Sequence, residues 1–502
     1  EDGIWLNRKV LFVAMNFMEF CSFGSSWKLL LKHWSPRCFR RCPPRTIKFS
    51  PMTSSKCLIM ASSSPSFSVN LCFLSLLFLL PLTSIADDFE NSFSMAFPLT
   101  FIPVSSSSAR ARLRERGRPT PRSNKLPTKF SRALMVSFPV GTPAQVQNLL
   151  LDTGSQLSWV QCGPQIKPSK TSGSSSSSSK ESFDPAMSTT FSPLSCDDPV
   201  CKPRVPDYSV PTACDQKRRC QYSYFYADGT LAEGKLVKDK VAVSTPLASS
   251  PIIIGCSEGS KDNNGILGMN MGRLSFVSQS RITRFSYCVP AIASHNAPSA
   301  TGALYLGGNP KAVGLKYVNL MKFPLPNRMP NLDPFVYTVP MKAIRVGTTT
   351  LNISQSAFRP NAGGSGQTFV DSGTELTYLV DEAYDKVKEA VVRLAGSLMK
   401  KDYSYARVAD ICFDARAAPL AARRIGGLAL VLDQGVEISI TSESLLFDVG
   451  NGAKCVPIGR SSMLGSAGNI IGVVHQQNMW IEYDIAGSRI GFGVADCSRS
   501  YS

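Results

Sequence analysis

Two short motifs, far apart in the chain, each place an aspartate in front of a small residue and a glycine. Asp152 opens Asp-Thr-Gly-Ser, and Asp371 opens Asp-Ser-Gly-Thr. Two carboxylates held close together cannot both ionise easily, so such a pair shares a proton. The ionised member can take a proton from a water molecule while the protonated member polarises a carbonyl group. These residues therefore indicate hydrolysis by general acid–base catalysis.

The residues around each aspartate are suited to hold it in place. An apolar run precedes both motifs and predicts a buried strand that ends at the carboxylate. Glycine at the third position lets the backbone form a tight turn. The neighbouring hydroxyl groups can orient the carboxylates and join the two turns. We predict this supporting role for Thr153, Gly154, Ser155, Ser372, Gly373 and Thr374.

The stretches around the two motifs repeat in the same order. LMVSFPVGT at 134–142 is echoed by YTVPMKAIRVGT at 337–348, and both stretches end in Val-Gly-Thr. After each aspartate motif come two apolar residues and a glycine, which is Gly268 in the first copy and Gly472 in the second. A half-molecule that occurs twice predicts two similar lobes with one aspartate turn each.

Longer motifs make the chain similar to the pepsin-like aspartic proteases, and among them to the plant nepenthesin-like, or "promotion of cell survival", type. The resemblance extends over roughly residues 131–502 and is carried by LLLDTGSQLSWVQC (149–162), CQYSYFYADGTLAEGKLV (220–237), GILGMNMGRLSFVSQ (265–279), FSYCVP (285–290), GGSGQTFVDSGTELTYLVDEAYDKV (363–387) and NIIGVVHQQNMWIEYD (469–484). It implies an all-β fold, a bilobal pepsin-like double β-barrel with a few short helices and an active-site cleft between the lobes. It also implies a monomeric aspartic-type endopeptidase that acts on proteins or peptides without a cofactor or metal.

The resemblance assigns roles to individual residues. Asp152 and Asp371 are the expected catalytic pair. Tyr226 matches the tyrosine of a flap that closes over the substrate, and Trp159 matches the tryptophan that hydrogen-bonds this tyrosine. The alternative for both aromatic residues is ordinary core packing.

Three positions depart from the family pattern. Ala227 stands where the flap motif usually has glycine, and Cys162 is the only cysteine close behind the first motif, where many relatives have two. Val473 follows Gly472 where asparagine is usual. This last change is expected to loosen the loop behind Asp371 and puts full activity in question.

The cysteines indicate an oxidising compartment. Of 15 cysteines, ten follow the predicted signal peptide, an even number that favours disulfides over a zinc site. By family likeness we expect Cys288 to pair with Cys497 and Cys412 with Cys455. We also expect a Cys196–Cys201 pair, although six cysteines in the first lobe allow fifteen pairings.

The chain divides into segments of different composition. Residues 1–59 are interpreted as a non-native extension, with translation starting at Met52 or Met60, and a transit-like segment is the alternative. Residues 60–86 resemble a signal peptide. The polar, Arg-rich stretch 87–130 is interpreted as a pro-segment, in which Lys125 and Lys129 are candidates to contact the catalytic carboxylates, with a solvated linker as the alternative. We place the N-terminal lobe at 131–300 and the C-terminal lobe at 301–502. The second lobe has one clear predicted helix, which Asp381 can cap and Gly396 can end.

Charge and targeting signals narrow the location and the partners. The formal charge is +18, but residues 1–130 hold 18 Lys/Arg against 7 Asp/Glu, so much of the excess lies outside the predicted lobes. This distribution argues against a nucleic-acid binder. A signal peptide without a retention signal or a second apolar run predicts the secretory pathway (ER, vacuole or apoplast) and no stable membrane anchor. Asn352 lies in the sequon Asn-Ile-Ser and is a glycosylation candidate.

Two other functions were weighed. Gly255-Cys256-Ser257-Glu258-Gly259 matches the nucleophile elbow of serine hydrolases, but the residues that follow are turn-like rather than helical, and His475 is the only downstream histidine candidate. The second alternative is a catalytically impaired binding or inhibitor protein on the same two-lobed scaffold.

Overall fold

The structure of the protein is a computed structural model. It describes residues 94–103, 132–163, 182–202, 210–226, 231–241, 250–257, 265–291, 300–323, 329 and 331–501. The predicted N-terminal extension and signal peptide, Lys125, Lys129 and Ala227 lie outside the described residues. Among the described residues, no helix has the length and apolar character needed to cross a membrane.

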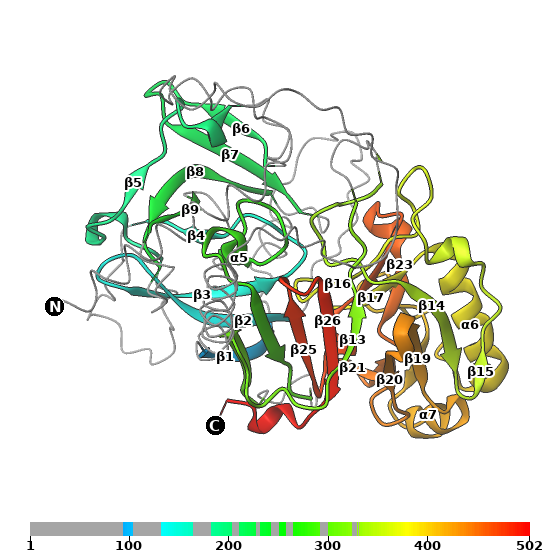
Figure 1. Ribbon diagram of the computed structural model, residues 1–502. Helices are drawn as coiled ribbons and strands as arrows, with labels where there is room; N and C mark the ends of the chain where they lie inside the picture. Colours follow the sequence, from blue (N-terminus) through cyan, green and yellow to red (C-terminus); the bar gives the residue numbers. More distant parts are fainter. Residues whose placement is uncertain are drawn as a thin grey trace, which may run out of the picture. The chain divides into compact units, whose positions relative to one another are not determined.

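The largest element is a 15-stranded sheet that takes strands from both halves of the chain (Figure 1). In spatial order the strands are β13 (Lys316–Asn319), β26 (Arg489–Val494), β25 (Met479–Asp484), β11 (Arg284–Cys288), β12 (Gly302–Gly307), β1 (Ser94–Pro103), β2 (Arg132–Val140), β3 (Gln145–Asp152), β10 (Gly265–Gly268), β4 (Trp159–Gln161), β9 (Ile252–Ser257), β8 (Leu231–Asp239), β7 (Cys220–Phe225) and β6 (Thr212–Cys214), with β5 (Ser192–Pro193) beside β8. The red strands β25 and β26 of Figure 1 come from the C-terminal end of the chain, and β25 pairs with β11 of the first half.

Three smaller sheets belong to the second half of the chain. They are β15 (Thr349–Thr350), β14 (Met341–Val346), β19 (Leu428–Leu432) and β20 (Glu437–Ile440); β16 (Thr368–Val370), β24 (Asn469–Ile471), β17 (Thr377–Leu379) and β23 (Ile458–Arg460); and β18 (Cys412–Asp414), β22 (Ala453–Cys455) and β21 (Phe447–Gly450). The all-β prediction is confirmed.

The predicted internal repeat has a counterpart in the strand order. In the first half β3, β10, β4 and β9 lie side by side, and in the second half β16, β24, β17 and β23 do so. In both sets the first two strands are parallel, the next pair is antiparallel and the last pair is parallel. The strand that ends at each aspartate is therefore paired with the strand that carries the apolar-apolar-glycine motif.

Helices are few among the described residues. They are α5 (Phe276–Gln279), α6 (Asp381–Ala395) and α7 (Ala418–Ile425), with 3-10 turns η2 (Pro185–Met187), η3 (Pro199–Cys201), η4 (Gln355–Ala357), η5 (Gly396–Leu398), η6 (Asp433–Gly435), η7 (Ser461–Leu464), η8 (Val473–Gln476) and η9 (Cys497–Arg499). The predicted helix is α6, and Gly396 ends it as expected. Asp381 does not cap it, because it is the first helical residue and accepts a hydrogen bond from Ser462. The sequence analysis missed α7.

One strand lies where the sequence analysis expected an irregular pro-segment. Within 87–130, residues Ser94–Pro103 form β1, which is hydrogen-bonded to β12 on one side and β2 on the other. Phe97, Leu99 and Phe101 alternate and are buried in the core. The description of 87–130 as a polar, Arg-rich stretch is wrong for these residues, because the arginines that follow them dominate the composition of the segment. Removal of this segment from the mature protein stays a prediction.

Five disulfides join the ten cysteines of the described part. Two of the pairs are those that the resemblance implies, Cys288–Cys497 and Cys412–Cys455. The expected Cys196–Cys201 pair is wrong. The bonds are Cys162–Cys256, Cys196–Cys214 and Cys201–Cys220. The reason is tertiary: the β6–β7 hairpin sets Cys214 opposite Cys220 and presents both to the turn that carries Cys196 and Cys201.

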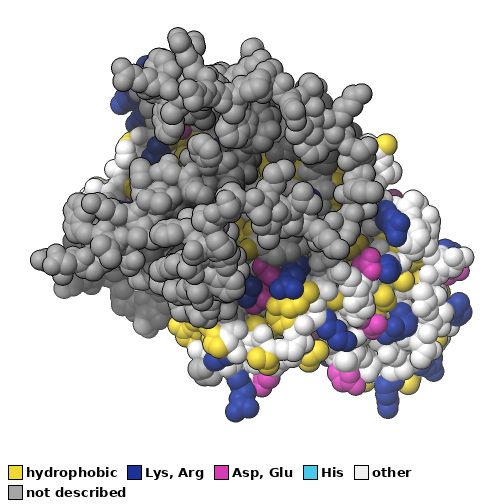
Figure 2. Space-filling view, in the orientation of Figure 1, with side chains coloured by type: hydrophobic (Ala, Val, Ile, Leu, Met, Phe, Trp, Pro, Cys, Tyr) yellow, Lys and Arg dark blue, Asp and Glu magenta, His cyan; other side chains and the backbone are white. Residues whose placement is uncertain are grey.

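Charged side chains on the described surface are mixed in sign. Figure 2 shows Lys and Arg interspersed with Asp and Glu on the described part of this face. Charged residues also form ion pairs with one another, such as Lys342–Asp433 and Arg345–Glu437. That part of the face therefore offers no continuous basic surface of the kind that a nucleic acid requires.

Candidate active site

The two aspartates lie at equivalent places in the repeated sheets. Asp152 is the last residue of β3, and Asp371 directly follows β16. Both residues are buried, each with 7% of its surface exposed. The backbone of each is tied to the neighbouring glycine-bearing strand, since Met269 N–H donates to Asp152 O at 2.8 Å and Asp371 N–H donates to Ile471 O at 3.1 Å. Two apolar strands thus deliver two carboxylates to one buried site.

The small residues behind the aspartates join the two turns. Thr153 N–H donates to Ser372 Oγ at 3.1 Å, and Ser372 N–H donates to Thr153 Oγ1 at 2.9 Å. Each hydroxyl then donates to a carbonyl across the interface, Thr153 to Val370 O at 3.3 Å and Ser372 to Leu151 O at 2.7 Å. The four bonds form a reciprocal clamp that fixes the separation of the two aspartate turns.

We expect Thr153→Val to destabilise the protein by about 1–3 kcal/mol, because valine keeps the shape of threonine but leaves the buried Ser372 N–H without its acceptor. Urea unfolding measures this change. The matched control is Thr153→Ser, which retains the hydroxyl and is expected to lose less. Equal stability of the two variants would show that the clamp contributes nothing.

The two carboxyl groups face each other across the glycine turns. A Cβ added to Gly154 would lie 2.9 Å from the carboxyl atoms of Asp371, and a Cβ added to Gly373 would overlap the carboxyl group of Asp152. Only glycine leaves room for this crossing. Each aspartate also accepts backbone hydrogen bonds in its own turn, Asp152 from Gly154 and Ser155 and Asp371 from Gly373.

Burial raises the pKa of both carboxyl groups above the usual value of an aspartate. The negative charge of Asp371 raises the pKa of Asp152 further. Asp371 accepts hydrogen bonds from Thr374 Oγ1, at 2.5 Å, and from Gly373 N–H. Both bonds lower the pKa of Asp371 and so partly offset the effect of burial. The pair can therefore hold one proton, and the donors around Asp371 favour the negative charge there.

Behind each aspartate turn, a hydroxyl group holds the glycine of the neighbouring strand. Ser158 Oγ accepts from Gly268 N–H at 3.0 Å, and Thr377 Oγ1 accepts from Gly472 N–H at 3.1 Å. The sequence analysis missed Ser158 and Thr377. Aligning the two copies, DTGSQLSW and DSGTELTY, would have found them, since both stand six positions after the aspartate.

The loop at Val473 is well anchored. Val473 is buried, and its N–H donates to Thr374 O at 2.8 Å. Gln476 donates from Nε2 to Asp371 O at 3.0 Å and to Ile471 O at 2.7 Å, and its Oε1 accepts from Tyr287 at 2.6 Å. The expected loosening of this loop is therefore not seen in its hydrogen bonds. Gln476 was not identified from the sequence, where it is one of several polar residues in a row.

The two aromatic residues assigned by resemblance are in contact. Trp159 Nε1 donates to the hydroxyl of Tyr226 at 2.8 Å. Tyr226 follows β7 and packs edge-on against Tyr224, with ring centroids 4.9 Å apart. Burial raises the pKa of Tyr226 well above that of free tyrosine, so its hydroxyl keeps its proton. Because the hydroxyl oxygen accepts from Trp159, that proton remains available to another acceptor.

The serine-hydrolase motif does not form an exposed nucleophile. Ser257 lies in β9 and is buried, and its neighbour Cys256 is bonded to Cys162. His475 contacts Thr377 of the second half instead. The only group of cysteine, histidine or acidic side chains with metal-like spacing among the described residues is Cys196, Cys201 and Cys214, whose sulfurs are used in disulfides.

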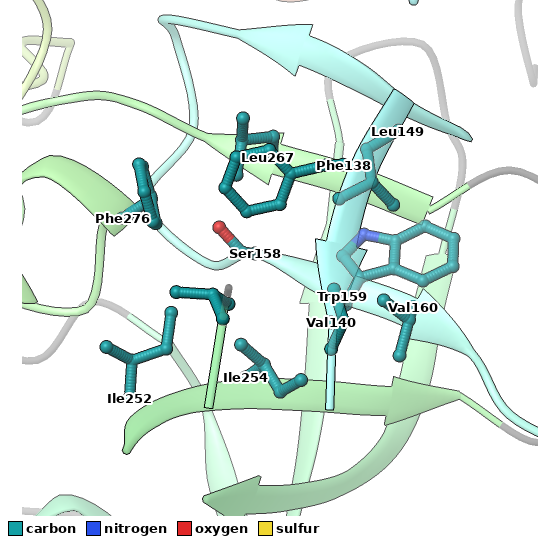
Figure 3. A pocket seen from close by; sticks show the side chains of 11 residues that line it. Phe138, Val140, Leu149, Ser158, Trp159, Val160, Ile252, Ile254, Leu267 and Phe276 are labelled. Atoms are coloured by element: carbon teal, nitrogen blue, oxygen red, sulfur yellow. The ribbon is translucent and has the colours of Figure 1, made fainter. Parts of the chain in front are cut away.

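The cavity drawn in Figure 3 is a packing void of the first half, separate from the aspartate pair. It has a volume of about 10 Å³ and is lined by apolar side chains and by Ser158. It is too small to hold a ligand.

Each half of the chain matches a known family model. Residues 135–308 match the family model described as xylanase inhibitor N-terminal, and residues 336–494 match that described as xylanase inhibitor C-terminal. Among curated proteins, the chain is 32% identical over 408 residues to aspartic proteinase PCS1 of Arabidopsis thaliana, covering 76% of this chain and 85% of the relative. It is 31% identical over 374 residues to aspartic proteinase nepenthesin-1 of Nepenthes gracilis, covering 73% and 78%.

Solved structures share the fold at low identity. The crystal structure of edgp has a TM-score of 0.55 at 16% identity and covers 80% of this chain and 95% of that chain. Basic 7S globulin from soybean has a TM-score of 0.54 at 16% identity and covers 82% and 99%. These similarities support the two-lobed architecture.

Proposed function

The chain belongs to the pepsin-like aspartic proteinase family, among its plant nepenthesin-like members, and from this premise we propose that it is an aspartic-type endopeptidase that activates a water between Asp152 and Asp371. The observation that carries the proposal is the crossing of the two buried carboxyl groups over each other's glycine turns. The reciprocal clamp of Thr153 and Ser372 supports it, because it holds the carboxyl groups at a fixed separation.

The proposed reaction needs only the shared proton and a water molecule. The ionised carboxylate takes a proton from the water molecule, and the oxygen of this water bonds to the carbonyl carbon of the scissile peptide. The protonated carboxyl group gives its proton to the carbonyl oxygen. The resulting tetrahedral diol collapses when the carboxyl group that took the water's proton gives it to the leaving nitrogen. The other carboxylate takes back a proton from a diol hydroxyl as the C–N bond breaks, which leaves a carboxylic acid, an amine and the original shared proton. The hydrogen bonds to Asp371 favour its ionised form, which suits it to the role of base.

We assign Tyr226 and Trp159 to the substrate side of the site. With its oxygen engaged by Trp159, the Tyr226 hydroxyl can donate to a bound peptide. Trp159→Phe is expected to lower kcat/KM about 5-fold, because one hydrogen bond of about 1 kcal/mol that orients the tyrosine is lost. Peptide hydrolysis kinetics measure this, with Trp480→Phe in β25 as the matched control. A normal kcat/KM in Trp159→Phe would leave Trp159 with a packing role only.

The location and oligomeric state are part of the same proposal. Five disulfides form and persist in an oxidising compartment, which supports the secretory pathway. We propose a monomer there, with protein or peptide substrates. Asn352, which is exposed, is the proposed glycosylation site.

The test is a quenched-fluorescent peptide library assayed from about pH 3 to 7, with and without pepstatin. Cleavage that pepstatin blocks would support the two-aspartate mechanism. The second candidate, a non-catalytic binding protein, is favoured by the inhibitor descriptions of the two matching family models. A folded protein that binds pepstatin but cleaves no peptide would move the assignment to that candidate.

A further inference from the structure

One buried titratable residue behind the catalytic turn has no part in the proposed chemistry. His475 lies in η8, directly after the strand that carries Gly472, and only 3% of its surface is exposed. Its Nδ1 lies 2.8 Å from Thr377 Oγ1, the same oxygen that accepts from Gly472 N–H. The ring therefore contacts the hydroxyl that anchors the loop behind Asp371.

The arrangement favours an uncharged ring. Since Thr377 Oγ1 accepts from Gly472, its own proton is free to be donated to Nδ1, which requires that Nδ1 be unprotonated. Nε2 is buried and has no hydrogen-bond partner among the described residues. With Nδ1 unprotonated, the neutral ring carries its one proton on Nε2. A second proton would have to go to Nδ1, where it would displace the hydrogen bond from Thr377 and leave a charge in the interior, which is strongly unfavourable.

None of the described groups that face η8 supplies a countercharge for such a proton. Tyr287 of β11 donates to Gln476 of η8 and keeps its own proton, because burial raises its pKa well above that of free tyrosine. η8 packs against β17, β20 and the catalytic turn. The ionisable groups on these elements are Asp371 and Glu375 of the turn, Tyr378 of β17 and Glu437 of β20. Asp371 and Glu375 are bonded to η8 through their backbone carbonyls, and Glu437 is paired with Arg345. Burial is accordingly the one cause that lowers the pKa of His475, from 6.5 to about 4.

We propose that His475 is a positioning residue that holds the loop behind Asp371 only while its imidazole is uncharged, so that protonation of His475 sets an acid limit to the stability and activity of the protein. The activity part of this inference rests on the proposed function, whereas the stability part does not. Two hydrogen bonds connect the surroundings of His475 to the catalytic turn. Thr377 Oγ1 accepts from Gly472 N–H, and Gln476, which follows His475 in the chain, donates to Asp371 O.

The direction of the pH effect follows from linkage. The pKa of His475 is lower in the folded protein than in the unfolded chain, so the unfolded chain binds the proton first as the pH falls. The stability contribution is complete above about pH 6.5 and is lost as the pH falls toward about 4. At about pH 4.5 the loss amounts to a change on the order of 100-fold in the ratio of folded to unfolded protein.

The test compares the parent protein with His475→Asn, whose Oδ1 can take the place of Nδ1 but cannot titrate. Urea unfolding near pH 7 and near pH 4.5 is expected to show a smaller acid loss in the variant, by the order of 100-fold. In an active enzyme, the acid limb of kcat/KM is also expected to move to lower pH. Thr377→Ser keeps the hydroxyl and serves as the control that leaves the acid loss unchanged. An acid loss in His475→Asn equal to that of the parent would overturn the inference.

A second measurement does not depend on any variant folding well. The chain has three histidines, His33, His295 and His475, so the ring signals of histidine-labelled protein are few enough to follow by NMR. One ring is expected to remain uncharged from about pH 8 to 5 and to titrate only near 4. If every ring titrated near 6.5, the inference would be wrong even in a fully active peptidase. If the ring behaves as expected in a protein without peptidase activity, the inference stands and only the proposed function fails.

Discussion

Replacing Asp152 or Asp371 by asparagine is expected to lower kcat/KM for peptide hydrolysis by about 10³-fold or more, because either change removes one of the two groups that exchange protons with the water and the carbonyl. Asparagine retains the size of the carboxyl group, so the loss reports chemistry rather than packing. The assay is hydrolysis of a fluorogenic peptide at the pH optimum of the parent protein. Asp433→Asn, the same chemical change at an exposed ion pair, is the matched control.

Asp152→Asn is also expected to change the stability of the protein, and here the expected effect is a gain rather than a loss. The pKa of Asp152 is raised by burial and by the charge of Asp371, so the folded protein holds a proton that the unfolded chain releases as the pH rises above about 4. The parent protein therefore loses stability from that pH toward neutrality. Asp152→Asn lacks this loss and is expected to be more stable than the parent near pH 7, by about 1 kcal/mol or more, with a smaller difference near pH 3.

Two outcomes would contradict these expectations. Activity retained in both Asp152→Asn and Asp371→Asn would refute the two-aspartate mechanism. An Asp152→Asn variant that is less stable than the parent at neutral pH would show that burial of the carboxyl pair does not destabilise the folded protein at that pH.

Gly472→Ala is expected to have the largest effect on stability, a loss of about 4 kcal/mol or more, or failure to fold. An added Cβ would overlap the carbonyl group of Leu376 and lie 3.0 Å from Glu375 O. Both neighbours are backbone atoms, and Glu375 O also accepts from Val474 N–H, so neither can move without breaking the loop behind Asp371. Expression yield and urea unfolding measure the effect.

Gly163→Ala provides the matched control, because within the described part of the chain its Cβ would meet only the Ser182 hydroxyl at 3.7 Å, an ordinary contact. This variant is expected to fold with nearly unchanged stability. A Gly472→Ala protein as stable as Gly163→Ala would mean that the close packing of the two strands at this point is not required.

The proposed function and the acid limit at His475 bound the pH range of activity from opposite sides. An acid–base pair that shares a proton operates on the acid side of neutrality, where buried neutral histidines become unfavourable. If both proposals hold, the working range is bounded on the acid side by His475 and on the neutral side by ionisation of the second aspartate. A narrow pH optimum above about 4 is the combined expectation.

The sequence by itself predicted the two-lobed plan and the aspartate pair on which the proposed chemistry depends. Two aspartates, each after an apolar strand and before a glycine, need no tertiary information to suggest a proton-sharing pair. The repeat of Val-Gly-Thr, aspartate motif and apolar-apolar-glycine predicted two similar lobes with one aspartate turn each. Local patterns of this kind are fixed by backbone sterics and by the period of side-chain burial, which act over a few residues.

What the tertiary structure decided depends on residues far apart in the chain. The Cys196–Cys214 and Cys201–Cys220 bonds follow from the register of a hairpin that spacing does not reveal. Phe97, Leu99 and Phe101 become a core strand only because β2 and β12 flank them. His475 offers an ordinary imidazole in the sequence, and burial next to Thr377 alone makes it a group that resists protonation. Desolvation and partner choice are properties of the folded surroundings, so no local pattern could supply them.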